Sequence, residues 1–258
     1  MTGEARTILC MKWGTLYGPE YVNVLYAAAK KATENPFRFV CLTDNPTGLA
    51  PGIEHFPIPD IGLRPEHFRG GGWPKFAVFK RDLYGLTGRA LFIDLDMVVL
   101  RDLDALFDRP EPLITTDMGP NWKPKHGTGA PEVGTCIFAF TLGEQQHLID
   151  GLLADLDRIV RETRYEQTAI GVLAKTMAFW PPDWVISFKR HLRRPIGIDL
   201  VMEPKAPPAS AKVLAFHGTP RPHELVRRGW WGKAPHMGRG PVSWMADYWR
   251  GNGGDAKS

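Results

Sequence analysis

The chain contains little cysteine, no long apolar run and no large excess of charge of either sign. Its 258 residues include only three cysteines, and Cys10, Cys41 and Cys136 each lie in an apolar segment. This small, odd number argues against a disulfide framework, and the chain contains neither a Cys-x-x-Cys nor a His-Glu-x-x-His zinc pattern. We therefore expect free, buried thiols in a reducing compartment.

The apolar runs are too short for a membrane-spanning chain. The longest uncharged one extends from residue 133 to residue 143, whereas a bilayer span needs ~20 residues. Residues 1–6 carry Glu4 and Arg6, and the short apolar run after them is not the core of a secretory leader. The formal net charge is only +4, and no nucleic-acid-binding module accompanies it. We expect a cytoplasmic protein with no nucleic-acid partner.

Strand and helix patterns alternate along the chain, separated by turns rich in its 27 Gly and 23 Pro. Short apolar runs predict strands, and apolar residues at helical spacing predict helices. The expected strands span residues 7–11, 37–43, 53–58, 90–93, 112–116, 136–141 and 213–216. The expected helices span residues 21–33, 75–84, 145–163 and 166–175. This order predicts an α/β, Rossmann-like fold with a mixed, mostly parallel central sheet flanked by helices.

An acidic pair follows the apolar strand at residues 90–93. Asp94 and Asp96 are expected at its carboxyl end, the edge where open α/β sheets bind ligands. Residues i and i+2 of a strand share a face, so both carboxylates are expected to converge on one cation. A hard divalent ion such as Mn²⁺ or Mg²⁺ would relieve their repulsion and keep positions open for phosphate oxygens. The alternative is a pair of turn-capping acids, like those expected of Asp102 and Asp104 at a helix start.

The segment Trp73-Pro74-Lys75-Phe76, with Leu-Phe-Ile-Asp-Leu-Asp-Met-Val at residues 91–98, resembles the core of GT-A fold glycosyltransferases. The resemblance is closest to the retaining family 8 type, which includes galactosyltransferases and glycogenin-like enzymes. It extends over residues 7–222 through three further segments, residues 12–17, 166–167 and 215–222. It implies a nucleotide-diphospho-sugar transferase fold in a domain of residues 1–222. It also implies a metal-dependent hexosyltransferase, which moves a sugar from a nucleotide-sugar donor to an acceptor hydroxyl. The donor implied by the family is a UDP-sugar, and the reaction implied retains the configuration of the anomeric carbon.

The resemblance also implies residue roles. The implied metal ligands are Asp94, Asp96 and His217. The implied nucleotide-sugar contacts are Lys12, Trp13, Gly14, Tyr17, Lys75, Asp94, Gly218 and Arg221. The candidates for catalysis or substrate positioning are Glu166 and Gln167, which resemble the Asp-Gln pair of the family, and Asp117, which ends an expected strand. The chain departs from the family at residues 132–135, which replace an Asn-x-Gly motif, and at Arg221, which replaces lysine. These departures leave the donor sugar open.

Two other functions use the same residues. Asp94 and Asp96 also match the Asp-x-Asp-x-Val signature of haloacid-dehalogenase-type phosphatases, as nucleophile and acid/base. That family places the motif near its N-terminus and needs a later acidic pair, which this chain lacks. A non-catalytic protein that binds nucleotide-sugars is the other alternative.

The C-terminal segment, residues 223–258, is basic and rich in tryptophan. From residue 221 onward the chain has seven Lys and Arg against three Asp and Glu, and four of its nine tryptophans. Such a segment either packs on the main domain or makes a peripheral contact with the inner face of a membrane. The acceptor is expected to be a carbohydrate, a lipid-linked group or a protein. We expect it to be selected by this segment and by the loop at residues 119–131.

Overall fold

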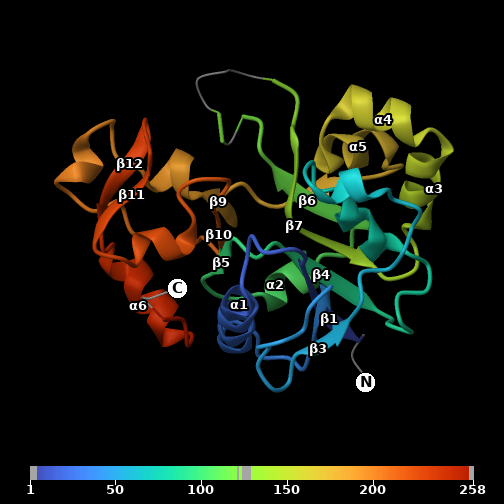
Figure 1. The fold of residues 1–258 in the computed structure, drawn as a ribbon, viewed down its shortest axis with the longest axis horizontal. Coiled ribbons are helices and arrows are strands. Elements are labelled where there is room, and N and C mark those ends of the chain that lie inside the picture. Colours follow the sequence, from blue (N-terminus) through green and yellow to red (C-terminus); the bar gives the residue numbers. More distant parts are fainter. Residues whose placement is uncertain (1–4, 121, 124–128, 256–258) are drawn as a thin grey trace.

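A seven-stranded sheet forms the centre of the computed structural model, which describes residues 5–120, 122–123 and 129–255 (Figure 1). The strand order is β3-β2-β1-β4-β7-β6-β8, so β4, the strand before the acidic pair, is central. Parallel pairing joins β3, β2, β1 and β4, while β7 runs antiparallel to both β4 and β6. The strands are β1 (Arg6–Lys12), β2 (Arg38–Thr43), β3 (Glu54–Phe56), β4 (Arg89–Ile93), β6 (Leu113–Asp117), β7 (Val133–Thr141) and β8 (Ala178–Phe179). The expected mixed, mostly parallel sheet is confirmed.

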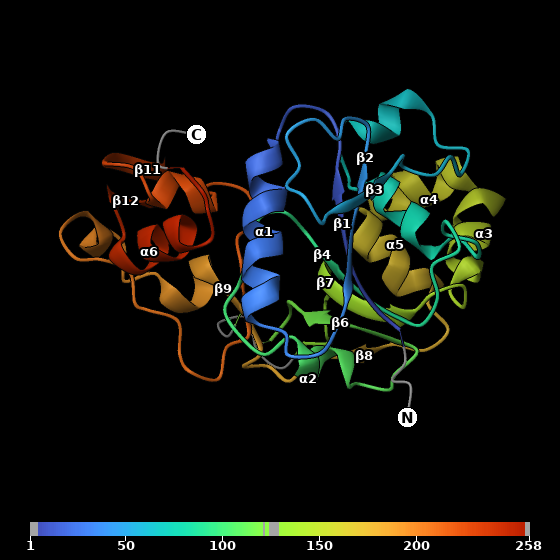
Figure 2. The same ribbon diagram turned by 90° about the horizontal axis from the view of Figure 1, so that it is seen from below.

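The central strands are apolar throughout because both faces of the sheet are covered. On β1, Ile8 and Cys10 point into one core and Leu9 and Met11 into the other, as the two-residue period of a strand requires. Figure 2 shows the helix α1 on one side of the sheet and α3, α4 and α5 on the other. The helices are α1 (Pro19–Lys31), α2 (Asp104–Phe107), α3 (Gln146–Ala154), α4 (Leu156–Thr163), α5 (Glu166–Leu173) and α6 (Ser243–Gly251).

Two expected helices differ in the structure. The segment expected to be helical over residues 75–84 is a shorter 3-10 helix, η2 (Trp73–Phe79), with every side chain buried. A helix without an exposed face does not follow an amphipathic pattern. The expected helix at residues 145–163 is divided into α3 and α4 at Asp155. The backbone of Asp155 is non-helical, and its carboxylate accepts a hydrogen bond from the Arg158 N–H as the N-cap of α4.

A smaller C-terminal lobe, residues 185–255, packs beside α1 (Figures 1 and 2). It contains β9 (Val185–Ser187), β10 (Val213–Ala215) and the hairpin β11 (Gly229–Lys233) and β12 (His236–Gly240), as well as α6. Its short helices are the π-helix η4 (Phe188–Leu192) and the 3-10 helices η5 (Ile198–Leu200) and η6 (Pro222–Leu225); a further one, η1 (Pro65–Phe68), lies outside the lobe. The strand β5 (Met97–Val99) pairs with β10 and joins the lobe to the residues that follow the acidic pair.

The tryptophans of the C-terminal segment divide into buried and exposed. Trp231 and Trp249 are buried in the core beside α1, and the Trp249 ring contacts Tyr21 with 5.2 Å between centroids. Trp244 is half-buried, and Trp230 is 69% exposed. Within the described residues, no helix combines the length and apolar character that crossing a membrane demands.

Candidate active site

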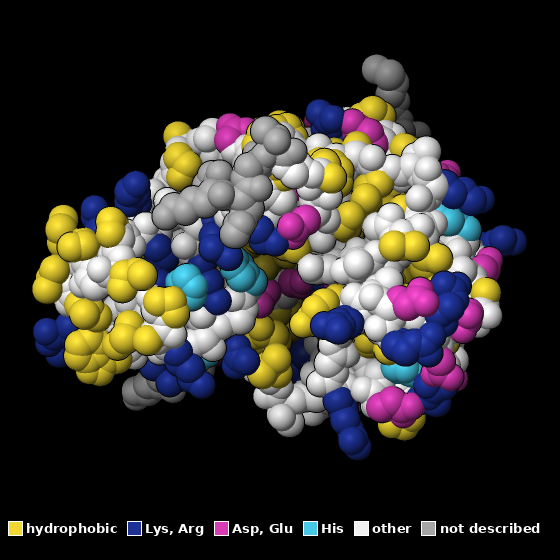
Figure 3. Space-filling model, turned by 90° about the horizontal axis from the view of Figure 1, so that it is seen from above, with side chains coloured by type: hydrophobic (Ala, Val, Ile, Leu, Met, Phe, Trp, Pro, Cys, Tyr) yellow, Lys and Arg dark blue, Asp and Glu magenta, His cyan; other side chains and the backbone are white. Residues whose placement is uncertain are grey.

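A cleft with a cavity volume of about 640 Å³ lies at the carboxyl ends of β1 and β4. Its walls come from the segment after β1, the start of η2, the turn after β4, β7, the start of α5 and the segment after β10. Figure 3 shows the hollow between the main body and the C-terminal lobe, with acidic and histidine side chains beside it. Segments far apart in the sequence therefore meet at the edge where the parallel strands end.

The acidic pair lies in a tight turn between β4 and β5, not on a continuing strand. The Asp94 N–H donates to the Cys136 carbonyl oxygen at 2.9 Å, and the Met97 N–H donates to the Asp94 carbonyl oxygen at 3.2 Å. Leu95 points into the core, while Asp94 and Asp96 both line the cleft. The turn thus brings both carboxylates to the same cleft, although they do not lie on a continuous strand.

Burial makes both carboxylates reluctant to ionise. It raises the pKa of Asp94 to about 7, with a further contribution from the charge of Asp96 and a partial offset from Lys75. The pKa of Asp96 rises to about 6 for the same primary reason, against the hydrogen bond that the Tyr17 hydroxyl donates to it at 3.0 Å. Two desolvated acids in one cleft form a site that is stabilised by added positive charge.

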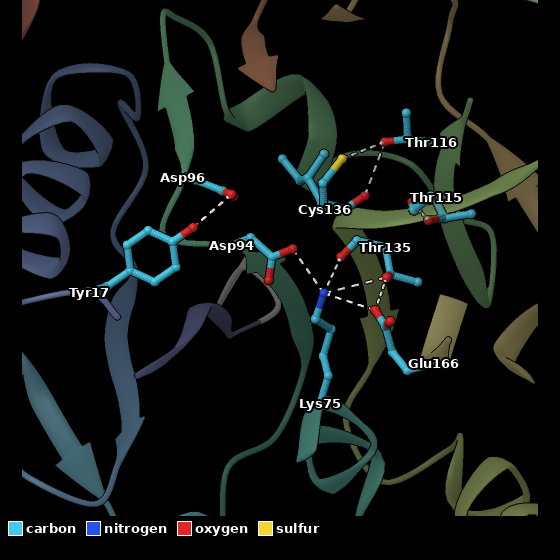
Figure 4. A network of polar contacts seen from close by, with 11 residues as sticks. Tyr17, Lys75, Asp94, Asp96, Thr115, Thr116, Thr135, Cys136 and Glu166 are labelled. Carbon is cyan, nitrogen blue, oxygen red and sulfur yellow. Dashed lines mark hydrogen bonds and ion pairs between the residues drawn. The ribbon is translucent and has the colours of Figure 1, made fainter. Parts of the chain in front are cut away.

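Lys75 is the centre of a buried polar network (Figure 4). From the first turn of η2, its ammonium lies 2.9 Å from Asp94 Oδ2 and 3.0 Å from Glu166 Oε1, and donates to the Thr135 carbonyl oxygen at 3.0 Å. Thr135 also donates its hydroxyl to Glu166. Burial lowers the pKa of Lys75, but the charges of Asp94 and Glu166 outweigh this effect and raise it, so Lys75 is a fixed cation.

The residues of the first loop that are expected to surround the nucleotide also line the cleft. Lys12 is buried and donates to the Asn45 carbonyl oxygen at 3.1 Å, and the Gly14 N–H donates to Asp44 at 2.8 Å. The Trp13 indole donates to the Phe68 carbonyl oxygen at 3.0 Å. These bonds tie the end of β1 and the loop after it to the segments at Asp44–Asn45 and Phe68.

Tyr17 connects this loop to the acidic pair and to Arg221. Its hydroxyl bonds to Asp96, and the Arg221 guanidinium lies 5.4 Å from the centroid of its ring. Arg221 is not among the residues that line the cleft, but its charge lowers the pKa of Asp96. It is therefore close enough to act on the acidic pair electrostatically.

His217 and Gly218 line the cleft from the C-terminal lobe, but His217 does not join the aspartates. Its ring stacks on Trp122 with 5.6 Å between centroids, and its Nδ1 lies 3.5 Å from Ser187 Oγ. Within residues 5–120, 122–123 and 129–255, no three His, Cys, Asp or Glu side chains are grouped so as to hold a metal ion. The three ligands implied by the resemblance are thus brought to one cleft without forming a closed ligand set.

The pKa of His217 is lowered to about 4, first by desolvation and then by the positive charges of Lys189 and Arg190. The ring is therefore neutral at neutral pH, the form in which imidazole binds metals.

The structure separates the three candidates for catalysis or positioning. Glu166 and Gln167, at the start of α5, line the cleft beside Lys75. Asp117 ends β6 and is not among the cleft-lining residues. Its carboxylate accepts hydrogen bonds from the N–H groups of Gly119 at 2.8 Å and Glu132 at 3.0 Å, so it holds together the two ends of the loop between β6 and β7. Part of that loop, residues 121 and 124–128, lies outside the described residues.

The sequence analysis did not assign Thr135 and Trp122 to the site. Thr135 is the last residue of the segment that replaces the Asn-x-Gly motif, and its place beside Lys75 depends on the antiparallel pairing of β4 with β7, in which Ile93 is opposite Ile137. The expected mixed sheet did not specify which strand pairs with β4, so the spacing carried no signal for this contact. Trp122 belongs to the site because its ring stacks on that of His217, which lies nearly a hundred residues further along the chain.

Comparisons with known proteins place this architecture among glycosyltransferases. No family model and no curated protein matches the chain. The galactosyltransferase LgtC, solved with donor and acceptor sugar analogues, matches with a TM-score of 0.58 at 14% identity over 95% of each chain. The match to the bifunctional glycosyltransferase WbbM covers 86% of this chain and 47% of the WbbM chain, with a TM-score of 0.57 and 16% identity. The match to the glycosyltransferase GlyE of Streptococcus pneumoniae TIGR4 covers 98% of this chain and 62% of the GlyE chain, with a TM-score of 0.54 and 12% identity. The chain therefore has the GT-A glycosyltransferase fold, as the sequence predicted.

Proposed function

We propose that this protein is a metal-dependent glycosyltransferase that moves a sugar from a nucleotide-sugar, a UDP-sugar in our reading, to an acceptor hydroxyl. One observation carries the proposal. In a GT-A fold, two half-buried carboxylates, Asp94 and Asp96, line the cleft at the carboxyl end of the central strand, beside the buried cation Lys75. A nucleoside diphosphate is the class of ligand that such a combination of acids and cation suits.

The acidic pair fits a divalent cation such as Mn²⁺ or Mg²⁺. Both carboxylates have raised pKa values because burial disfavours their charged forms, and a cation between them would remove that cost. Asp94 and Asp96 are therefore the proposed ligands. His217, neutral and in the same cleft, is the proposed third ligand on the basis of its sequence motif. When bound, the ion supplies positive charge to the diphosphate that leaves the sugar.

Two cations of the chain are suited to the same task. Lys75 is held rigidly by Asp94, Glu166 and Thr135, so its charge requires no reorganisation when negative charge develops on the leaving phosphate. The positive charge of Arg221 lowers the pKa of Asp96, and its guanidinium suits a bidentate contact with phosphate oxygens. We propose that Lys75, Arg221 and Gly218 contact the donor at its diphosphate.

Glu166 and Gln167 are proposed to position the transferred sugar. The Glu166 carboxylate is already bound by Lys75 and Thr135, which favours holding a sugar hydroxyl over attacking a carbon atom. This agrees with a retaining reaction that needs no strong protein nucleophile, which we propose from the family resemblance. The loop with Lys12, Trp13, Gly14 and Tyr17 is proposed to receive the nucleoside. Asp117 is proposed to act indirectly, through the loop between β6 and β7 that would face the acceptor.

The cellular location is proposed from the thiols. Cys10 and Cys41 are buried and Cys136 is half-buried, and all three are free, which suits a reducing cytoplasm. The acceptor is proposed to be a carbohydrate, free or linked to a lipid or protein.

A ligand screen followed by a turnover assay tests the function. Thermal unfolding is measured with UDP, GDP and ADP, each with and without Mn²⁺. We expect stabilisation by UDP that requires the metal, because a ligand that binds only the folded state raises its stability. UDP-sugars that stabilise the protein are then assayed for release of UDP. Binding without any release of UDP would favour the non-catalytic alternative. Absence of stabilisation by every nucleotide would refute the proposal.

A transphosphorylation assay addresses the remaining alternative. The phosphatase reading requires a phosphorylated Asp94, which acid-quenched mass spectrometry with a generic phosphate ester would detect. We expect no such adduct, because the chain has the fold of glycosyltransferases.

A further inference from the structure

An apolar patch covers part of the C-terminal lobe. We define it by five side chains that are large, hydrophobic and exposed: Ile196, Ile198, Val201, Met202 and Trp230. They are five of the eleven such side chains among the described residues. Ile196 is 80% exposed, Val201 81% and Trp230 69%. Figure 3 shows hydrophobic side chains gathered over this lobe, on the left of the view. Exposed apolar residues scattered singly are ordinary, but four within residues 196–202, with Trp230 on the same lobe, indicate a surface for interaction.

The local structure turns these side chains outward. Asp199, in the middle of the loop, is buried and bonded to Arg193, and this anchor fixes the backbone on either side of it. The loop is also tied to the hairpin, because Arg193 donates to the carbonyl oxygens of Pro235 and Met237. In β11, strand alternation buries Trp231 and leaves Trp230 in solvent. The backbone that carries the patch is therefore held in place by these hydrogen bonds.

The segment of the chain that carries the patch is strongly basic. Residues 188–240 contain eleven Lys and Arg but only three Asp and Glu. Of these three acids, Asp199 is paired with Arg193, and Glu224 accepts hydrogen bonds from the Arg221 and Gly232 N–H groups. The exposed cations of this segment are Arg190, Lys205, Arg227, Arg228, Lys233 and Arg239. Apolar side chains with a tryptophan, surrounded by Lys and Arg, match the two parts of an anionic bilayer surface: acyl chains below and negative headgroups above.

We propose that the apolar patch docks on the surface of an anionic lipid bilayer. The side chains of the loop enter the headgroup and acyl boundary, Trp230 lies at headgroup level, and the surrounding cations contact the lipid phosphates. Figure 3 shows the hollow and the hydrophobic side chains of the lobe on the same face, so docking through this lobe brings the mouth of the cleft near the lipid surface. An acceptor sugar carried by a lipid would then be presented to the cleft. This last point rests on the proposed function, whereas the docking itself does not.

Vesicle sedimentation tests the docking. The full chain is centrifuged with vesicles of phosphatidylcholine alone and with vesicles that also contain phosphatidylglycerol. We expect binding to the anionic vesicles only, weakened by salt. The substitutions Val201→Ser and Trp230→Ala should each lower the partition coefficient about tenfold, because each removes an inserted apolar group.

Val172→Ser is the matched control, because Val172 is 71% exposed on α5, outside the C-terminal lobe. It should bind as the wild type does. Metal-dependent nucleotide binding is measured on each variant and should not change, which separates this result from the fate of the proposed function. The proposal is overturned by equal binding of wild type and patch variants, or by equal binding to neutral and anionic vesicles. A dimer in solution that dissociates on Val201→Ser, with no vesicle binding, would also overturn it and identify a second copy as the occupant.

Discussion

The ammonium of Lys75 lies 2.9 Å from the carboxylate of Asp94, although the residues are nineteen positions apart and come from different elements. Lys75 also binds the buried Glu166, so one cation serves two acids, while Asp96 accepts a hydrogen bond from the neutral hydroxyl of Tyr17. The acids near the turn therefore outnumber the cation that is buried with them. This imbalance is the physical reason why we expect the cleft to accept a divalent ion together with a diphosphate.

Replacing the acidic pair should remove metal-dependent nucleotide binding. Asp94→Asn and Asp96→Asn keep the shape of each side chain but lose the charge that binds the ion. We expect calorimetry to show no Mn²⁺-dependent affinity for UDP in the double variant, with the fold intact by circular dichroism. Asp247→Asn, at an exposed position on α6, is the control and should bind as the wild type does. Unchanged affinity in the double variant would contradict the assignment.

Removing the Lys75 cation should destabilise the protein. Lys75→Met leaves the buried Glu166 carboxylate and the half-buried Asp94 carboxylate without their shared partner, and breaking a buried pair costs about 3–5 kcal/mol. The loss in the free energy of unfolding should be largest in mildly alkaline buffer and smaller in acid, where the carboxylates take up protons. Urea denaturation at two pH values measures both. Lys80→Met, at the exposed end of η2, should cost little, and equal losses for the two variants would argue against the network.

The acidic pair should make the metal-free protein less stable as pH rises. Folding raises the pKa of Asp94 to about 7 and that of Asp96 to about 6, from ~3.9 in the unfolded chain. Between these values the folded state holds more protons than the unfolded state, so the contribution of the pair is complete below pH ~4 and is lost as pH approaches 7.

The measurement is the difference in thermal midpoint between wild type and the Asp94→Asn, Asp96→Asn double variant, in chelator, across this range. The wild type should lose stability relative to the variant as pH rises. A difference that is constant, or that moves the other way, would show that the carboxylates ionise normally.

In the glycine-rich loop before η2, an alanine should be tolerated at Gly70 but not at Gly72. Gly72 has a φ of +75°, and a Cβ there would lie 2.7 Å from Glu166 Oε2. Gly72→Ala should therefore cost about 1–3 kcal/mol from the backbone alone. It should also displace Glu166, which we expect to lower sugar transfer more than UDP binding. Gly70→Ala is the matched control, because its Cβ would meet no atom within 4 Å. Similar unfolding midpoints for the two variants would be evidence against this geometry.

Much of the fold and part of the site could be predicted from local patterns. The apolar run of β4 followed by Asp94 and Asp96 identified the central strand and the ligand-binding edge, because a strand buried on both faces is apolar throughout and its carboxyl end carries the polar groups. The His217 segment was likewise assigned to the same cleft. These features depend on residues close together in sequence, or on motifs that carry their own chemistry.

The sequence by itself determined the sheet class, the acidic pair and part of the set of residues that border the cleft. Only the tertiary structure decided that Lys75 bridges Asp94 and Glu166, that the His217 ring stacks on Trp122, and that Trp230 faces solvent while Trp231 is buried. Each of these depends on which strand pairs with β7 and how the C-terminal lobe packs on α1. Those choices follow from the burial of side chains over the whole molecule, which no local spacing encodes.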